Sequence, residues 1–300
     1  MPKQECLLVK TASEIALKSD FVRRFFTKKL VRAIKLALKR NKVQHDSILK
    51  GGGRLYVLCR SPKKAREILS RVSGIHATAI AQMHSFSSLA EMESEVVSFS
   101  KGFLKKGNSF AIDARVVGSK GFSKKDLENT LGAAVMAAIP DLVVKLKGPE
   151  KTIFVEARKK DFFVYSEQLR GLGGLPLGVE GNVAMFFSGK KDDVVASFLL
   201  MHRGCSIFPV VKKQSAKTKA LVKKLVPFNS YRQFAITEQK NLEALVSERN
   251  IQAVATADSK TDKKSLASYK AFDAKQSLVV LRPLLLYPKE SRKRVEALFS

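Results

Sequence analysis

Cysteine and long apolar stretches are both scarce in this chain of 300 residues. The three cysteines, Cys6, Cys59 and Cys205, lie far apart and form no C-x-x-C pair, so the sequence favours neither a disulfide framework nor a metal site. Such cysteine usage is typical of a reducing compartment. No apolar run approaches the roughly 20 residues that span a bilayer, and no leader pattern is visible. We therefore expect a soluble, cytoplasmic protein that associates with neither a metal nor a membrane.

Acidic residues are also few relative to basic ones. The chain has 55 Lys and Arg against 27 Asp and Glu, a formal net charge of +28. The excess is +14 over residues 1–80, +2 over 81–180 and +12 over 181–300. An imbalance of this size attracts polyanions, and nucleic acid is the leading candidate. The alternative, a lysine-rich surface that only solvates or thermostabilises the protein, usually comes with matching glutamate.

The N-terminal pattern predicts a ferredoxin-like domain over residues 1–80. Residues 4–9 read as a strand, and Ser19-Asp20 begins a long amphipathic helix that runs to about Arg40. A further strand is predicted over 54–60, a helix after Ser61-Pro62, and a strand after Gly74. The predicted apolar side of the long helix comprises Phe21, Val22, Phe25, Phe26, Leu30, Val31, Ala33, Ile34, Ala37 and Leu38. A basic amphipathic helix can also lie on an anionic membrane, but the strands that follow provide a sheet for it to cover.

A second α/β unit is predicted over residues 81–172. Ser88 and Ser123 each have an acidic residue three positions later, which predicts helices over about 88–106 and from 123 to near Pro140. Strands are expected over 110–117, 143–146, 152–157 and 162–166. Five glycines within residues 170–181 predict a turn-rich connection. Residues 173–300 then alternate short apolar strands with helices, which predicts a small doubly wound parallel sheet; its expected strands include one over 232–236.

Several segments together resemble the tRNA 4-thiouridine synthetases, the thiamine-biosynthesis-type tRNA sulfurtransferases, and in particular a short archaeal subgroup. The matching stretches are EIALK at 14–18 with the following RRFF, GRLYV at 53–57, SGI at 73–75, Ala114-Arg115, Lys120 with Phe122, VEARKKDFFVYSEQLRGLGGLPLGVEG at 155–181, Ser188-Gly189, LLMHRGC at 199–205 and LRPLLLYPKE at 281–290. The resemblance implies a ferredoxin-like domain over 1–80, a THUMP RNA-binding domain over 81–172 and a PP-loop ATP-pyrophosphatase-like domain over 173–300. It also implies that tRNA is the partner.

The resemblance further assigns RNA contacts to seven basic residues in the first two domains. In the family these domains hold the acceptor region and the single-stranded end of tRNA, where basic side chains neutralise phosphates. For any one residue, a solvated surface charge is an equally good interpretation. The seven residues are Lys18, Arg23, Arg24, Arg54, Arg115, Lys120 and Arg170.

The third domain departs from the family pattern S-G-G-x-D-S, whose glycines let backbone N–H groups approach pyrophosphate. The corresponding residues here are Ser188, Gly189, Lys190, Lys191, Asp192 and Asp193. Lys190 adds a side chain where phosphate would lie, and the Asp193 carboxylate would repel it. A rearranged loop in which Lys190 and Lys191 bind phosphate is the alternative. The family's T-G-E-x-x-G-Q segment is likewise changed, at residues 256–267, and the catalytic cysteine has no counterpart.

We therefore expect a tRNA-binding protein without catalytic residues or a cofactor of its own. One alternative is an active ATP-dependent tRNA sulfurtransferase, with ATP as its cosubstrate. Another is a scaffold that delivers tRNA to a second modifying enzyme. The family also includes homodimers.

Overall fold

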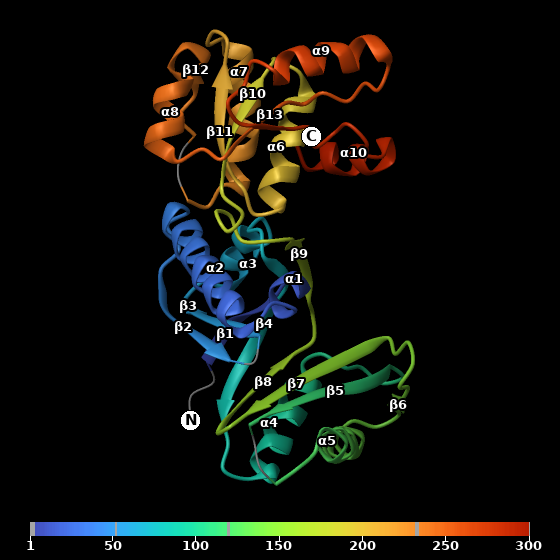
Figure 1. Ribbon diagram of the computed structural model, residues 1–300. Coiled ribbons are helices and arrows are strands. Elements are labelled where there is room, and N and C mark those ends of the chain that lie inside the picture. Colours follow the sequence, from blue (N-terminus) through green and yellow to red (C-terminus); the bar gives the residue numbers. More distant parts are fainter. Residues whose placement is uncertain (1–3, 52, 119–120, 232–233, 300) are drawn as a thin grey trace. The chain divides into compact units, whose positions relative to one another are not determined.

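The computed structural model describes residues 4–51, 53–118, 121–231 and 234–299 (Figure 1). Its internal contacts form two compact units. The first comprises Met1–Lys10, Val43–Glu67 and Ala77–Arg170, and the second comprises Thr11–Lys42, Ile68–His76 and Gly171–Ser300. Within the described ranges, no helix combines the length and apolarity needed to cross a membrane.

The N-terminal elements follow the order of a ferredoxin-like fold, as the sequence predicts. They are β1 (Gln4–Thr11), α1 (Ser13–Ala16), α2 (Asp20–Arg40), β2 (His45–Gly51), β3 (Arg54–Cys59), α3 (Pro62–Leu69) and β4 (Ile75–Ser85). The strands lie in the order β2-β3-β1-β4. Strand β3 pairs antiparallel with both β1 and β2, so its residues point alternately to the two faces of the sheet.

The next part of the chain, residues 89–165, extends the same sheet through the order β4-β8-β7-β5-β6. Its elements are α4 (Leu89–Lys101), β5 (Ser109–Val117), α5 (Lys124–Ala138), β6 (Val143–Val144), β7 (Lys151–Arg158) and β8 (Asp161–Tyr165). Strands β5 and β7 are parallel, whereas β7 and β8 are antiparallel. Helices α4 and α5 bury Met92, Val96, Leu127, Leu131 and Val135 in one core with the strands (Figure 1). Ser123 and Asp126 form the predicted capping box of α5.

One prediction in this region is wrong, and the predicted turn-rich connection over 170–181 is right only after β9. Helix α4 ends at Lys101 instead of near Lys106, because the chain turns at Gly102 and buries Leu104. The stretch after Arg170 begins with a strand, β9 (Leu169–Gly173), that pairs with β4. Gly171 in β9 lets the backbone of this strand approach that of β4 closely, because a Cβ on Gly171 would lie 2.4 Å from the carbonyl oxygen of Ile75.

The C-terminal part forms a five-stranded parallel sheet of order β12-β11-β10-β13-β14. Its elements are β10 (Asn182–Phe187), α6 (Lys191–His202), β11 (Ser206–Val211), α7 (Ala216–Leu225), β12 (Thr237–Glu238), α8 (Leu242–Arg249), β13 (Ala253–Ala255), α9 (Lys263–Asp273), β14 (Val279–Leu281) and α10 (Lys289–Glu296). The strand predicted over 232–236 is not seen as such: residues 232 and 233 lie outside the described ranges, and β12 begins at Thr237.

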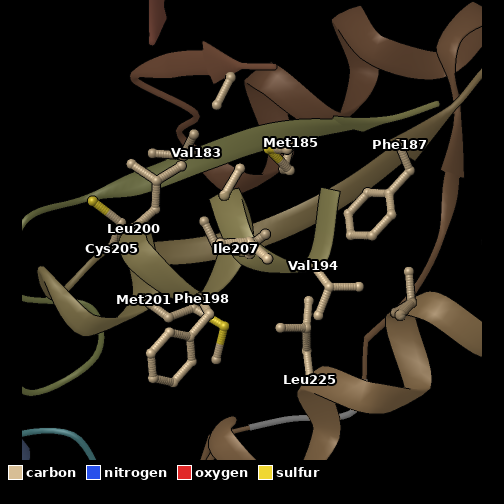
Figure 2. Packing of buried hydrophobic residues seen from close by; sticks show 14 of the residues in the cluster. Val183, Met185, Phe187, Val194, Phe198, Leu200, Met201, Cys205, Ile207 and Leu225 are labelled. Carbon is tan, nitrogen blue, oxygen red and sulfur yellow. The ribbon is translucent and has the colours of Figure 1, made fainter. Parts of the chain in front are cut away.

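Residues of β10 alternate between two apolar cores. Val183, Met185 and Phe187 pack with side chains of α6, α7 and α10, and Figure 2 shows part of this cluster. Ala184 and Phe186 face the other way and pack with side chains of α8. Helices therefore cover both faces of the sheet, which confirms the doubly wound architecture. Cys205 is 8% exposed and packs within the first of these cores (Figure 2).

Candidate nucleic-acid interface and nucleotide loop

Helix α2 presents most of its cations to solvent. The buried residues Phe26, Leu30 and Ile34 recur every four positions, so they line one stripe of the helix. Cationic residues occupy most of the remaining surface; the exposed ones are Arg23, Arg24, Lys28, Arg32, Lys35, Lys39 and Arg40. Phe21 and Phe25 were predicted on the apolar side, but they are 83% and 43% exposed. The first turn of α2 is therefore a basic surface with accessible aromatic rings.

Three of the seven residues predicted to contact RNA lie at this end of α2. Lys18 is exposed and its Nζ lies 5.9 Å from the centre of the Phe26 ring. Arg23 pairs with Asp20 within the first turn, and Arg24 is exposed. The three residues share a surface within the second compact unit.

Three others lie on strands of the first compact unit. Arg54 is on β3, Arg115 is half-buried on β5, and Arg170 is exposed on β9. Lys120 lies outside the described residues. Arg54 lies opposite Lys10 in the antiparallel pair of β1 and β3. Burial, and after it the charge of Arg54, lowers the pKa of Lys10, and the charge of Arg115 adds to this effect. The structure therefore gathers Arg54 and Arg115 about a lysine that the sequence did not single out.

A buried carboxylate, Glu156 on β7, contacts this group of cations. Arg54 Nε donates to its Oε1 at 3.1 Å and Arg158 Nη2 to its Oε2 at 3.2 Å. Burial raises the pKa of Glu156, but the charges and hydrogen bonds of the two arginines outweigh burial, and the net pKa is lowered. Sequence reasoning did not identify Glu156 or Arg158. The available signal was their i, i+2 spacing in the segment VEAR, which places both side chains on one face of a strand.

Backbone amides of the loop after β10 donate hydrogen bonds to the carboxylate of Asp193, in the first turn of α6. Gly189 N and Lys190 N donate to Asp193 Oδ2 at 2.8 and 3.0 Å, and Ser188 Oγ donates to Oδ1 at 3.1 Å. Gly189 has φ of +86°, a conformation that favours glycine. Asp193 is 1% exposed, and burial raises the pKa of its carboxyl against the opposing hydrogen bonds. The two backbone amides therefore already have an anionic acceptor, while the side chain of Lys190 is exposed.

This loop lies where open α/β sheets usually bind ligands. Strand β10 is central, with β11 on one side and β13 on the other, so the loop after β10 sits at the switch in strand order. After β13, Thr256 Oγ1 donates to Asp258 at 2.7 Å. Arg282, which follows β14, donates to Asp258 at 3.1 Å and to Asp273 at 2.7 Å. Protein side chains thus pair with one another at this edge of the sheet.

Lysines remain beside the loop. An open cavity of about 850 Å³ next to Ser188 and Gly189 is lined by Lys212, Lys213 and Lys217.

Burial raises the pKa of the thiols of Cys6, Cys59 and Cys205, that of Cys6 to about 12. A raised pKa lowers the fraction of a thiol that is present as the nucleophilic thiolate at neutral pH.

Two known domain families match the chain. The ThiI ferredoxin-like domain matches residues 6–79, and the THUMP domain matches residues 86–167. The tRNA sulfurtransferase of Blochmanniella pennsylvanica is 32% identical over 204 residues, which is 67% of this chain and 42% of the relative. The chain is a relative of the tRNA sulfurtransferases. It spans about half the length of the curated sulfurtransferases that it matches.

Two solved structures share the fold of this sulfurtransferase relative. PH1313 from Pyrococcus horikoshii superposes with a TM-score of 0.86 at 23% identity, covering 98% of both chains. A 4-thiouridine synthetase, whose structure holds RNA and ATP, superposes with a TM-score of 0.80 at 17% identity, covering 98% of this chain and 85% of its own. At these identities the likeness establishes the fold: ferredoxin-like, THUMP and parallel-sheet C-terminal parts.

Proposed function

We propose that this protein binds tRNA and that its C-terminal domain does not adenylate it. The observation that carries tRNA binding is the consecutive match to a ThiI ferredoxin-like domain and a THUMP domain, in a chain whose curated relatives are named tRNA sulfurtransferases. A 4-thiouridine synthetase of the same fold has been solved with RNA bound. On this proposal the protein works where tRNA is, in the cytoplasm.

Charge supports RNA binding at both ends of the chain. The exposed cations of α2 form one basic surface, and the cations near Glu156 form another. The C-terminal domain adds a cluster of lysines, at positions 212, 213, 217, 219, 223 and 224. Neutralising phosphates with such side chains releases counterions, which makes binding strongly dependent on salt. On this proposal Lys18, Arg24 and Arg54 are contact residues of the N-terminal half.

The loop after β10 supports the loss of adenylation chemistry. A pyrophosphate would need the amides of Gly189 and Lys190, which already donate to Asp193 at 2.8 and 3.0 Å. Displacing a buried carboxylate would leave it without partners, and a second anion beside it would be repelled.

A second candidate function is an active tRNA sulfurtransferase. The names of the curated relatives favour it, as does the ATP in the structure of the 4-thiouridine synthetase. Incubating the protein with ATP, tRNA and sulfide separates the two candidates. We expect neither AMP nor 4-thiouridine above background, and formation of both would establish the enzyme.

Fluorescence anisotropy with labelled tRNA tests the binding itself. We expect saturable binding at 100 mM salt, and an unlabelled tRNA competitor should displace the probe. Absence of binding at that salt concentration would contradict the proposed function.

A further inference from the structure

Glu156 is the centre of a buried polar cluster in the first compact unit. Four groups donate to its carboxylate: Arg54 Nε at 3.1 Å, Tyr165 Oη at 3.1 Å, Arg158 Nη2 at 3.2 Å and Tyr56 Oη at 3.3 Å. The carboxylate is 3% exposed. Because a carboxylate has about four acceptor positions, its hydrogen-bonding capacity is fully used. We call these five residues the Glu156 cluster.

Aromatic packing holds the Glu156 cluster in place. The Tyr56 ring stacks on Phe163 at 4.0 Å, and the Tyr165 ring stacks on Phe154 at 5.0 Å. Strand β4 contributes Ala79 and Ala81 to the buried centre of this core, and its Met83 packs against them. The tyrosine hydroxyls, and the carboxylate between them, therefore have little freedom to move.

The two arginines keep donors that the cluster does not use. Among the described residues, Arg54 donates only through Nε, so the edge formed by its two terminal nitrogens has no acceptor. The Nε of Arg158 is buried and likewise has no partner within the described chain. A Cβ on Gly51 would lie 3.1 Å from Arg158 Nη1, so this glycine lets the guanidinium lie against the backbone. A guanidinium edge with two parallel N–H groups matches the oxygens of a phosphate.

The charges of the site do not balance. Lys10 Nζ lies 5.4 Å from the Phe154 ring centre and 5.6 Å from that of Tyr165, next to the cluster. Lys10, Arg54, Arg115 and Arg158 thus bring four positive charges to the site, against the two carboxylates of Glu156 and Asp113. Half-buried positive charge in excess attracts an anion more strongly than the same charge in water does.

We propose that the Glu156 cluster binds a backbone phosphate of RNA, with Arg54 as the contact residue and Glu156 as a positioning residue that fixes the Arg54 guanidinium. This inference rests on the proposed tRNA binding and adds to it a specific site. A merely structural cluster would have no reason to keep the outer edge of Arg54 open and the charge in excess.

The substitution Glu156→Gln distinguishes a positioning role from a simple charge effect, because the two predict opposite changes in the affinity for tRNA. Removing a negative charge beside bound RNA would, by charge alone, tighten binding and leave the salt slope unchanged or steeper. If Glu156 positions Arg54, the affinity for tRNA instead falls, by about 10- to 150-fold, the range that one charge-assisted hydrogen bond gives. The slope of log K against log salt becomes shallower by about 0.9, which corresponds to one phosphate contact.

Two further variants control the result. Asp113→Asn removes an exposed carboxylate on β5 that pairs with Lys124 and does not touch the arginines; we expect unchanged or tighter binding. Arg54→Lys keeps the charge and removes the planar edge, so we expect the affinity to fall as it does in Glu156→Gln. Because Arg54 is partly exposed, this variant is expected to fold even if Glu156→Gln does not, and circular dichroism melting checks both.

Anisotropy titrations of the wild type and the three variants with unfractionated tRNA, from 50 to 200 mM salt, give the outcome. Weaker binding in Arg54→Lys, together with weaker binding and a shallower slope in folded Glu156→Gln, supports the site. Wild-type affinity in Arg54→Lys, or tighter binding in Glu156→Gln, overturns this inference and leaves the proposed function standing. Failure of the wild type to bind tRNA overturns both.

Discussion

Replacing Asp193 should open the loop after β10 to phosphate at a measurable cost in stability. The variant is Lys190→Gly combined with Asp193→Ser, which restores glycine and serine at the two changed positions. The substitution removes the acceptor of Gly189 N and Lys190 N, at 2.8 and 3.0 Å, and of Ser188 Oγ, at 3.1 Å. Losing a comparable helix N-terminal acceptor costs about 1–2 kcal/mol. Burial raises the pKa of the Asp193 carboxyl, because desolvation of the charged form costs free energy. Removing the carboxyl recovers part of that cost, so we expect the net loss of stability to lie near the lower end of the 1–2 kcal/mol range.

Two assays follow from this estimate. Thermal unfolding should show a fall of roughly 2–4 °C, since 1 kcal/mol corresponds to about 2–4 °C in a unit of this size. Isothermal titration with Mg–ATP should show no binding by the wild type and binding by the double variant. Equal binding by both proteins would refute the inference that Asp193 blocks the loop. An increase in melting temperature would show that the three hydrogen bonds do not stabilise it.

Two further predictions concern stability. The pKa of Glu156 is lowered on folding, so its ionised form contributes stability that is present above the unfolded pKa of about 4.3 and is lost as the pH falls through the folded pKa. The difference in melting temperature between wild type and Glu156→Gln should therefore be largest near pH 7 and should shrink below pH ~4. A difference that stays constant with pH would contradict this prediction. Gly174 has φ of +70°, and a Cβ there would lie 2.3 Å from the carbonyl oxygen of His202, so Gly174→Ala should cost at least about 2 kcal/mol in urea unfolding. Its matched control is Gly132→Ala, in open space within α5, which should instead gain about 0.5–1 kcal/mol; similar values for the two would contradict the local geometry.

Local signals in the sequence were sufficient for most of the fold. The apolar period of α2 and the Ser123 capping box predict helices that the structure contains. Glycine was harder to interpret, because its two uses look alike in sequence. At Gly171 it allows a close approach to Ile75 within a strand, whereas at Gly174 it provides a positive φ. The prediction of a turn-rich connection over 170–181 did not separate these two uses.

The candidate sites, like the glycines, could be interpreted only in part from the sequence, because their contacts depend on the fold. A carboxylate at position 193 is visible in the sequence, but only the fold shows that it accepts hydrogen bonds from the amides that a phosphate would use. The Glu156 cluster was out of reach of sequence reasoning. Arg54 and Glu156 are separated by 102 positions, and the hydrogen bond between them depends on the packing of β3 and β7 within one sheet.

The salt dependence of tRNA affinity tests the central claim most directly. Even four neutralised phosphates predict a slope of log K against log salt of about −3.6, which is a loss of roughly 150-fold between 50 and 200 mM. We expect a slope at least this steep for the wild type. A flat response over that range, or no binding at 100 mM salt, would contradict tRNA binding by this protein.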